Sequence, residues 1–90
     1  MLNLRTTAKY RKDRKLAIRR GLPMELLDET LETLVQEKPL SPSHKDHALF
    51  GLYTGFRECH IMADWLLIYK IDKGSIILTA ARTGTHSDLF

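Results

Sequence analysis

The 90-residue chain is predicted to form one α+β domain: a short N-terminal strand and two helices, then an antiparallel β-meander. Apolar residues recur at three- and four-residue steps in the first half, as in amphipathic helices. Short runs rich in β-branched and aromatic residues, separated by turn residues, follow in the second half. Residues 1–90 leave little room for a second core, so we expect a single domain with both helices on one face of the sheet.

The first third is expected to hold a strand and a strongly basic helix. Leu2–Arg5 alternates in polarity, which predicts the strand. Thr6 or Thr7 could cap the helix, which should run to about Arg20 and stop at Gly21. Because its apolar stripe is thin, much of this helix must face water or a polyanion.

The second helix is expected to start with Pro23 in its first turn and to end before Pro39. Its apolar stripe should pack on the sheet and consists of Met24, Leu27, Leu31, Leu34 and Val35. A connection from Pro39 to about Tyr53 follows. A loop this long in so small a domain is often functional.

Three strands are predicted after this loop. They are Gly55–Ile61, the nearly continuous apolar run Trp65–Ile71, and Ser75–Ala81. Residues 62–64 form the first turn and residues 72–74 the second, a hairpin turn. The tail, Arg82–Phe90, is expected to contain a glycine turn followed by a histidine.

Charge is unevenly distributed along the chain. Eight of the fourteen Lys and Arg residues lie between Arg5 and Arg20, with Asp13 as the only acid among them. Glu25–Glu37 carries five acids and no base. This pattern fits two solvated helix faces that attract each other, and it fits equally an electrostatic footprint for RNA or an acidic partner.

Several classes of protein do not fit the sequence. The longest apolar run is broken by Lys70, so we expect no membrane span, and no apolar stretch of the signal-peptide kind follows the N-terminus. Cys59 is the only cysteine, which fits a reducing cytoplasm, and we expect it to be a small buried strand residue. Nucleophile-elbow and P-loop motifs are absent.

Four histidines lie in the second half of the chain. His44 and His47 are three residues apart, and His60, Asp64 and His86 could add metal ligands. However, no HExxH or CxxC spacing occurs, so we expect neither a metal site nor a cofactor.

The same residues suit cleavage of an RNA phosphodiester better. This reaction needs a base for the 2′-OH proton, an acid for the leaving 5′-oxygen and a cation beside the phosphorane. His60 and Asp64 lie at a strand-to-turn junction, and Arg82 and His86 follow a neighbouring strand. Trp65 could stack on an unpaired base. Each has a structural alternative: Asp64 could shape its turn, Trp65 could fill the core and Arg82 could pair with a carboxylate.

Four segments together resemble the YafQ-type toxins of the RelE/ParE superfamily. They are KDHAL at 45–49, GFRECHI at 55–61, DWLLIYK at 64–70 and RTGTHSDLF at 82–90. The basic first helix, the acidic second helix and the order of elements agree as well, so that the resemblance covers the whole chain.

The resemblance implies a RelE-like fold and a bacterial, cytoplasmic toxin of a type II toxin–antitoxin module. Such toxins enter the ribosomal A site and cut mRNA through the RNA 2′-OH, without a cofactor. The implied partners are a cognate antitoxin, the ribosome and mRNA, with operator DNA bound only through the toxin–antitoxin complex and no membrane.

The resemblance also implies the site residues. The active-site set is His47, His60, Asp64, Arg82 and His86, with Trp65, Phe90 and Lys45 as auxiliary members. In this set His86 is the general acid, His60 or Asp64 helps to take the 2′-OH proton, and Arg82 stabilises the phosphorane. The residues implied to contact ribosomal RNA are Lys9, Arg11, Lys12, Arg14, Lys15, Arg19 and Arg20.

Two other functions on the same fold remain open from the sequence. One is a non-enzymatic, ParE-like inhibitor of gyrase, and the other is an RNA- or ribosome-binding module that does not cleave. Primer extension on mRNA from expressing cells separates them from the nuclease, because only the nuclease leaves new ends at translated codons.

Overall fold

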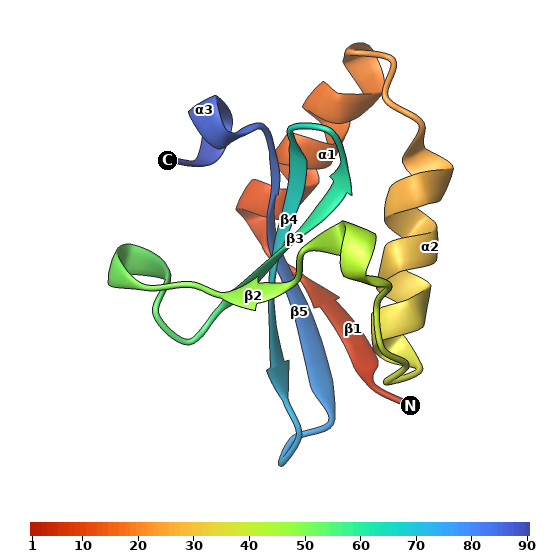
Figure 1. The fold of residues 1–90 in the computed structure, drawn as a ribbon, viewed down its shortest axis with the longest axis vertical. Helices are drawn as coiled ribbons and strands as arrows, with labels where there is room; N and C mark the ends of the chain where they lie inside the picture. The colour runs from red at the N-terminus through yellow and green to blue at the C-terminus, as the bar shows by residue number, and fades with distance from the viewer.

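A five-stranded mixed sheet forms the centre of the computed structural model, which describes all 90 residues. The strand order is β1-β5-β4-β3-β2, in which β1 pairs parallel with β5 and all other pairs are antiparallel. The strands are β1 (Asn3–Thr6), β2 (His47–Ala48), β3 (Arg57–Met62), β4 (Trp65–Asp72) and β5 (Ile77–Gly84). The predicted α+β class is confirmed (Figure 1).

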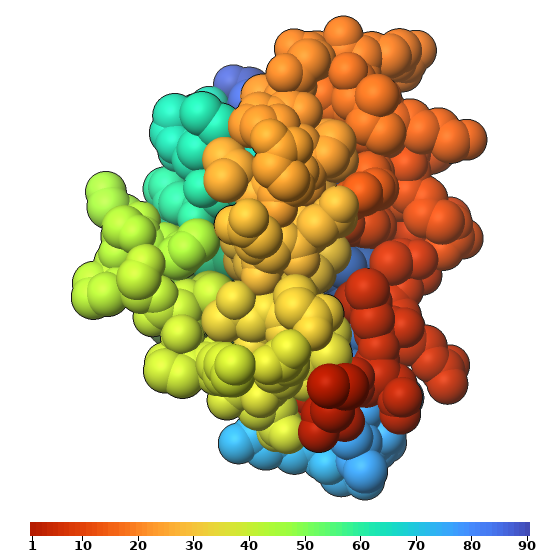
Figure 2. Space-filling view, turned by 90° about the vertical axis from the view of Figure 1, so that its right-hand side faces the viewer, coloured from red at the N-terminus to blue at the C-terminus, as the bar shows by residue number.

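Two long helices, α1 (Ala8–Arg19) and α2 (Met24–Val35), cover one face of this sheet. The Thr7 hydroxyl accepts a hydrogen bond from the Tyr10 amide and caps α1, and Gly21 follows its end at φ 75°. Pro23 is the N-cap of α2 rather than its first helical residue. Figure 2 shows α2 running down the middle of this side, between α1 and the segment that leads to β2.

The main hydrophobic core lies between these helices and the sheet. Cys59 is fully buried there, as predicted, and burial raises the pKa of its thiol to about 12. None of the helices has the length and apolar character required to cross a membrane. The core residues are Leu2, Tyr10, Ala17, Leu27, Leu31, Leu34, Cys59, Ile61, Trp65, Leu67, Tyr69, Leu78 and Ala80.

A smaller apolar cluster covers the opposite face of the sheet, and this face carries the functional side chains described below. It consists of Leu66, Ile68, Ala81 and Leu89. Leu89 belongs to α3 (His86–Leu89), a short C-terminal helix that packs against the end of β5. Two 3-10 turns of the 39–53 connection flank β2. The first, η1 (Pro42–His44), lies on the α2 side, and the second, η2 (Gly51–Tyr53), packs through Tyr53 on Phe90.

The second half departs from the predicted boundaries in three places. The final strand continues to Gly84, so Arg82 lies inside β5 and not beyond it. Residues 86–89 form the helix α3, which was not predicted and which starts at a reciprocal capping box between Thr85 and Asp88. The hairpin turn after β4 is longer than three residues and includes Ile76 at φ 57°.

Candidate active site

A buried glutamate lies at the centre of the candidate site. Glu58 opposes Ile68 across the β3–β4 pair, so its side chain is on the face of the smaller cluster. Only 3% of Glu58 is exposed. Its Oε1 atom lies 3.6 Å from Nε2 of His47, 3.8 Å from Nε2 of His60 and 4.0 Å from Nε2 of His86. One carboxylate therefore faces three imidazoles.

The other ring nitrogen of each histidine fixes the tautomer. Nδ1 of His47 lies 2.7 Å from the Lys45 carbonyl, and Nδ1 of His60 lies 3.3 Å from the Ala63 carbonyl. Nδ1 of His86 lies 2.5 Å from a carboxylate oxygen of Asp64. Because these oxygens only accept, Nδ1 carries the hydrogen in all three rings. In a neutral ring, Nε2 is then the free base, and it points toward Glu58.

Asp64 holds His86 in place from the turn between β3 and β4. One Asp64 carboxylate oxygen accepts from both Nδ1 and the backbone amide of His86. The hydrogen bond from His86 keeps the pKa of Asp64 below its usual value. Gly84 allows α3 to approach, because a Cβ there would lie 2.9 Å from Oδ2 of Asp88. The helix α3, which begins with His86, is therefore packed closely against the end of β5.

Arg82 lies at the edge of this face rather than among the histidines. Ile68 of β4 lies between Glu58 of β3 and Arg82 of β5 and opposes both of them. The Cα atoms of Arg82 and Glu58 are therefore two strand spacings apart, about 10 Å. Nε and Nη2 of Arg82 donate to the Asp13 carboxylate of α1, at 2.7 and 3.1 Å. This pairing raises the pKa of Arg82, and a smaller increase in this pKa comes from the nearby Tyr53 hydroxyl. Nη1 makes no hydrogen bond to Asp13, so its two N–H groups can donate to a phosphate.

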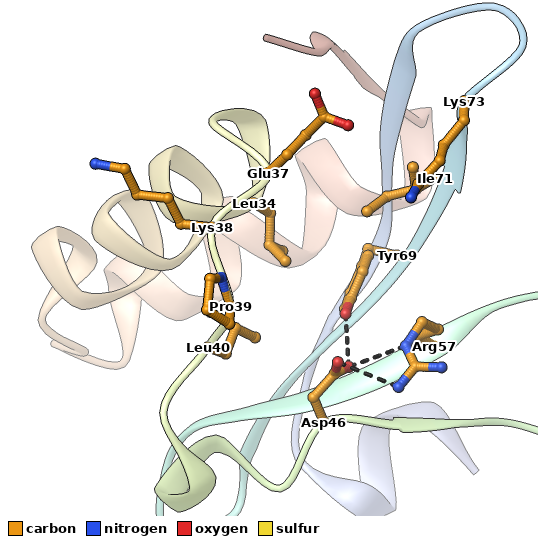
Figure 3. Close-up of a pocket in the computed structure, with 10 residues that line it drawn as sticks. All are labelled: Leu34, Glu37, Lys38, Pro39, Leu40, Asp46, Arg57, Tyr69, Ile71 and Lys73. Carbon is orange, nitrogen blue, oxygen red and sulfur yellow. Dashed lines mark hydrogen bonds and ion pairs between the residues drawn. The ribbon is translucent and has the colours of Figure 1, made fainter.

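A polar network holds Asp46, the residue that precedes His47. Asp46 accepts a 2.5 Å hydrogen bond from the Tyr69 hydroxyl and two from the Arg57 guanidinium, at 3.3 and 3.2 Å (Figure 3). Burial and the Asp46 carboxylate raise the pKa of Tyr69 well above its usual value. The network borders a groove of about 320 Å³ between the end of α2 and the sheet. These hydrogen bonds of Asp46 help to hold the two-residue strand β2 against β3.

The structure brings together four of the five predicted catalytic residues: His47, His60, Asp64 and His86. The Phe90 ring lies beside them, with its centroid 6.1 Å from that of His86. Lys45 lies outside the cluster and lines a pocket of about 450 Å³ with His60. Trp65 is 3% exposed and donates to the Thr83 hydroxyl, so it packs in the core and does not offer a stacking face.

The basic residues of α1 fall into two groups. Arg14 pairs with Asp28 at 3.0 Å, and Arg20 pairs with Asp88 of α3 at 2.7 Å. Each of these two arginines therefore already has a carboxylate partner within the protein. The cations of this helix without a carboxylate partner are Lys9, Arg11, Lys12, Lys15 and Arg19.

Sequence reasoning missed three residues of the site region: Glu58, Asp13 and Tyr53. The signal for Glu58 was present, because it is two residues before His60 in a strand and must share its face. Asp13 was noted only as the single acid in a basic helix. Tyr53 was taken as the end of a loop, yet its ring packs edge-on against Phe90 with centroids 5.6 Å apart.

This arrangement can move protons to and from a bound substrate. It offers three imidazole Nε2 atoms, which can accept or donate a proton, around one buried carboxylate. No group of three or more His, Cys, Asp or Glu side chains is arranged to hold a metal ion. Acid–base chemistry on a phosphodiester or an acyl group fits this set.

Comparisons with known proteins place the chain in a family. A family model described as the YafQ toxin of bacterial type II toxin–antitoxin systems matches residues 2–90. The mRNA interferase toxin YafQ of Escherichia coli K12 is 42% identical over 86 residues, covering 93% of this chain and 90% of that protein. A metal-bound toxin from Helicobacter pylori is similar with a TM-score of 0.94 and 42% identity over all of both chains. A chain of the Escherichia coli DinJ–YafQ complex reaches 0.90 at 35% identity, covering 100% and 99%. The chain therefore belongs to the YafQ family of bacterial type II toxin–antitoxin toxins.

Proposed function

We propose that this toxin is a ribosome-dependent mRNA endoribonuclease that cuts RNA by acid–base catalysis with its own side chains. The observation that carries the proposal is the convergence of three Nε2 atoms on the Glu58 carboxylate, with His86 oriented by Asp64. The similarity to an mRNA interferase toxin over almost the whole chain supports mRNA as the substrate.

In the proposed reaction the RNA supplies the nucleophile. The 2′-oxygen attacks the adjacent phosphorus while the bond from phosphorus to the 5′-oxygen breaks, which leaves a 2′,3′-cyclic phosphate and a 5′-hydroxyl end. Nε2 of His60 takes the 2′-OH proton, because its Nδ1 already donates to the Ala63 carbonyl. Protonated His86 gives a proton to the leaving 5′-oxygen. In this proposal Asp64 acts through His86, because its Oδ1 accepts from both the ring and the backbone amide of that residue.

Two further residues act on the phosphate. His47 faces the same carboxylate as the two acid–base residues, and in its protonated form it can bind a phosphate oxygen. Arg82 contributes positive charge from the edge of the site through Nη1, while Asp13 fixes the direction of its guanidinium. Glu58 balances the charge of whichever ring is protonated.

The partners follow from the same assignment. The unpaired cations of α1 form a surface suited to ribosomal RNA, because each can release a counterion from a phosphate. A solved DinJ–YafQ complex supports a cognate antitoxin for this chain too. Operator DNA would be bound only by the toxin–antitoxin complex, in the bacterial cytoplasm.

The test is to map mRNA ends after brief expression of the wild-type chain and of His86→Ala. New 5′-hydroxyl ends at translated codons are expected for the wild type. The variant should lose about a hundredfold or more of the cleavage rate, the usual contribution of a general acid. Ser87→Ala is the matched control, because Ser87 is the exposed neighbour of His86 on the same helix and its side chain makes no hydrogen bond.

Circular dichroism and thermal unfolding establish that each variant is folded. Intact mRNA in cells arrested by the wild-type chain would contradict the proposal, and so would full cleavage by a folded His86→Ala variant. Cleavage by purified toxin of free RNA as readily as of ribosome-bound mRNA would contradict the ribosome dependence alone.

A further inference from the structure

The loop between β2 and β3 carries an aromatic side chain that the site described above does not use. Phe50 is 86% exposed, although large apolar side chains are usually covered. In Figure 1 this loop extends from the sheet on the same side as α3 and the C-terminus. Phe50 is three residues after His47, so at most about 10 Å of extended chain separates it from the catalytic cluster.

The loop is a braced structure, which holds Phe50 in the open. The Leu49 amide donates to the Phe56 carbonyl at 2.9 Å, which closes the base of the loop. The Thr54 hydroxyl donates to the Gly51 carbonyl at 2.7 Å, and Gly51 has the left-handed φ of 69° that glycine favours. Because the backbone around Phe50 is fixed, a ligand that covers the ring has to restrict only the rotation of this one side chain.

Aromatic rings connect this loop to the catalytic cluster. The Tyr53 ring packs edge-on against Phe56, with centroids 6.2 Å apart, and against Phe90 at 5.6 Å. Phe90 in turn lies 6.1 Å from His86. The positive charges nearby are Lys70, whose Nζ is 5.5 Å from the Phe56 ring centre, and Arg82 beside Tyr53. Aromatic faces with adjacent cations are the usual surface for unpaired nucleotides.

We propose that Phe50 is a stacking platform for a base of the mRNA next to the cleaved bond, and so a substrate-positioning residue. This inference rests on the proposed nuclease function. Unpaired RNA fits better than a protein partner, because the row of rings runs continuously from Phe50's loop to His86, where the scissile bond must lie. Every base has a π-face, so this contact would add binding energy with little choice of sequence.

The test compares steady-state cleavage of mRNA on programmed ribosomes by four chains: wild type, Phe50→Ala, Phe50→Trp and Leu52→Ala. Loss of one base–aromatic stack should raise KM for Phe50→Ala about fivefold to a hundredfold and leave kcat within about twofold. Phe50→Trp should match or improve on the wild type. Leu52 is the matched control, since it is fully exposed on the same loop but has no π-face, and Leu52→Ala should behave as wild type.

Each outcome supports or overturns the inference. An unchanged KM for Phe50→Ala overturns it, as does an equal loss in Leu52→Ala, which would indicate a general apolar surface. If Phe50→Ala cuts normally but escapes inhibition by the antitoxin, the loop is a protein-docking surface and the RNA assignment is wrong. Absence of any cleavage by the wild-type chain would instead refute the nuclease function itself, which keeps the two failures distinct.

Discussion

Glu58 is the residue on which the geometry of the site most depends. It is buried, and its Oε1 is within 4.0 Å of three imidazole nitrogens. A carboxylate at this distance attracts a cationic group electrostatically, and a neutral amide of the same shape does so far less. Glu58 therefore interacts electrostatically with all three histidines, although in the proposed reaction it neither takes nor gives a proton.

We predict that Glu58→Gln lowers kcat for mRNA cleavage by about tenfold or more while the protein stays folded. Glu58→Asp, which keeps the charge, should restore part of the rate. An equal loss of rate in Glu58→Gln and Glu58→Asp would mean that the shape of Glu58, and not its charge, is what the site requires.

At the scale of residues, the sequence identified most of the cluster but not its geometry. His47, His60, Asp64 and His86 were predicted from their motifs, and they do meet. The pairing of Arg82 with Asp13 could not be foreseen, because it joins residues 69 apart through the packing of α1 on β5. Chain positions alone do not indicate which acid a strand arginine will reach.

Two short elements, β2 and α3, position His47 and His86 of the candidate site, and both were absent from the predicted elements. Two residues are too few for a periodic pattern, so β2 could not be recognised. Its place depends on pairing with β3 and on the Asp46 network. The capping box at Thr85 and Asp88 was a readable signal for α3. The helices α1 and α2 and the strands β4 and β5 were predicted well, because each is long enough to show a periodic or continuous apolar pattern.

The ion pair between Arg20 and Asp88 ties α3 to the end of α1. It lowers the pKa of Asp88 far below the usual value, chiefly through the Arg20 guanidinium and then the Thr85 amide. A depressed carboxyl pKa stabilises the fold above the ordinary Asp value of about 3.9, and this contribution is lost as the pH falls toward the lower folded value. Docking of α3 should thus persist throughout the neutral range.

We predict that Arg20→Ala and Asp88→Asn reduce mRNA cleavage by similar factors, and that the double variant is no worse than either one. Asparagine at 88 can still cap Thr85, so the change mainly removes the charge. Both variants should speed amide hydrogen exchange at Leu89, because α3 loses its tie to α1. If Arg20 instead acts by binding RNA, Arg20→Ala alone would weaken cleavage, Asp88→Asn would have no effect, and exchange at Leu89 would stay slow.

Over the whole molecule, charge separates between the two helices of one layer. Exposed acids lie on α2, and the unpaired cations lie on α1 beside it. The sequence left open whether these segments neutralise each other. The structure contains only one ion pair between them, Arg14 with Asp28. Most of the basic charge on α1 is therefore available to a polyanion, while Glu58 and the histidines lie on the other face of the sheet.

This separation predicts how binding to the ribosome depends on salt. Lys12→Ala and Lys15→Ala should each weaken binding and reduce the slope of log affinity against log salt concentration by about one, since each removes a phosphate contact. The cleavage rate at saturating ribosome should not change for Lys15→Ala, because Lys15 is exposed and does not line the pocket that Lys12 shares with Arg82. Lys73→Ala is the matched control: this exposed lysine follows β4 at the opposite end of the molecule, and its loss should leave the slope unaltered (Figure 1). Equal slopes for all three variants would show that net charge, and not the surface of α1, attracts the toxin to ribosomal RNA.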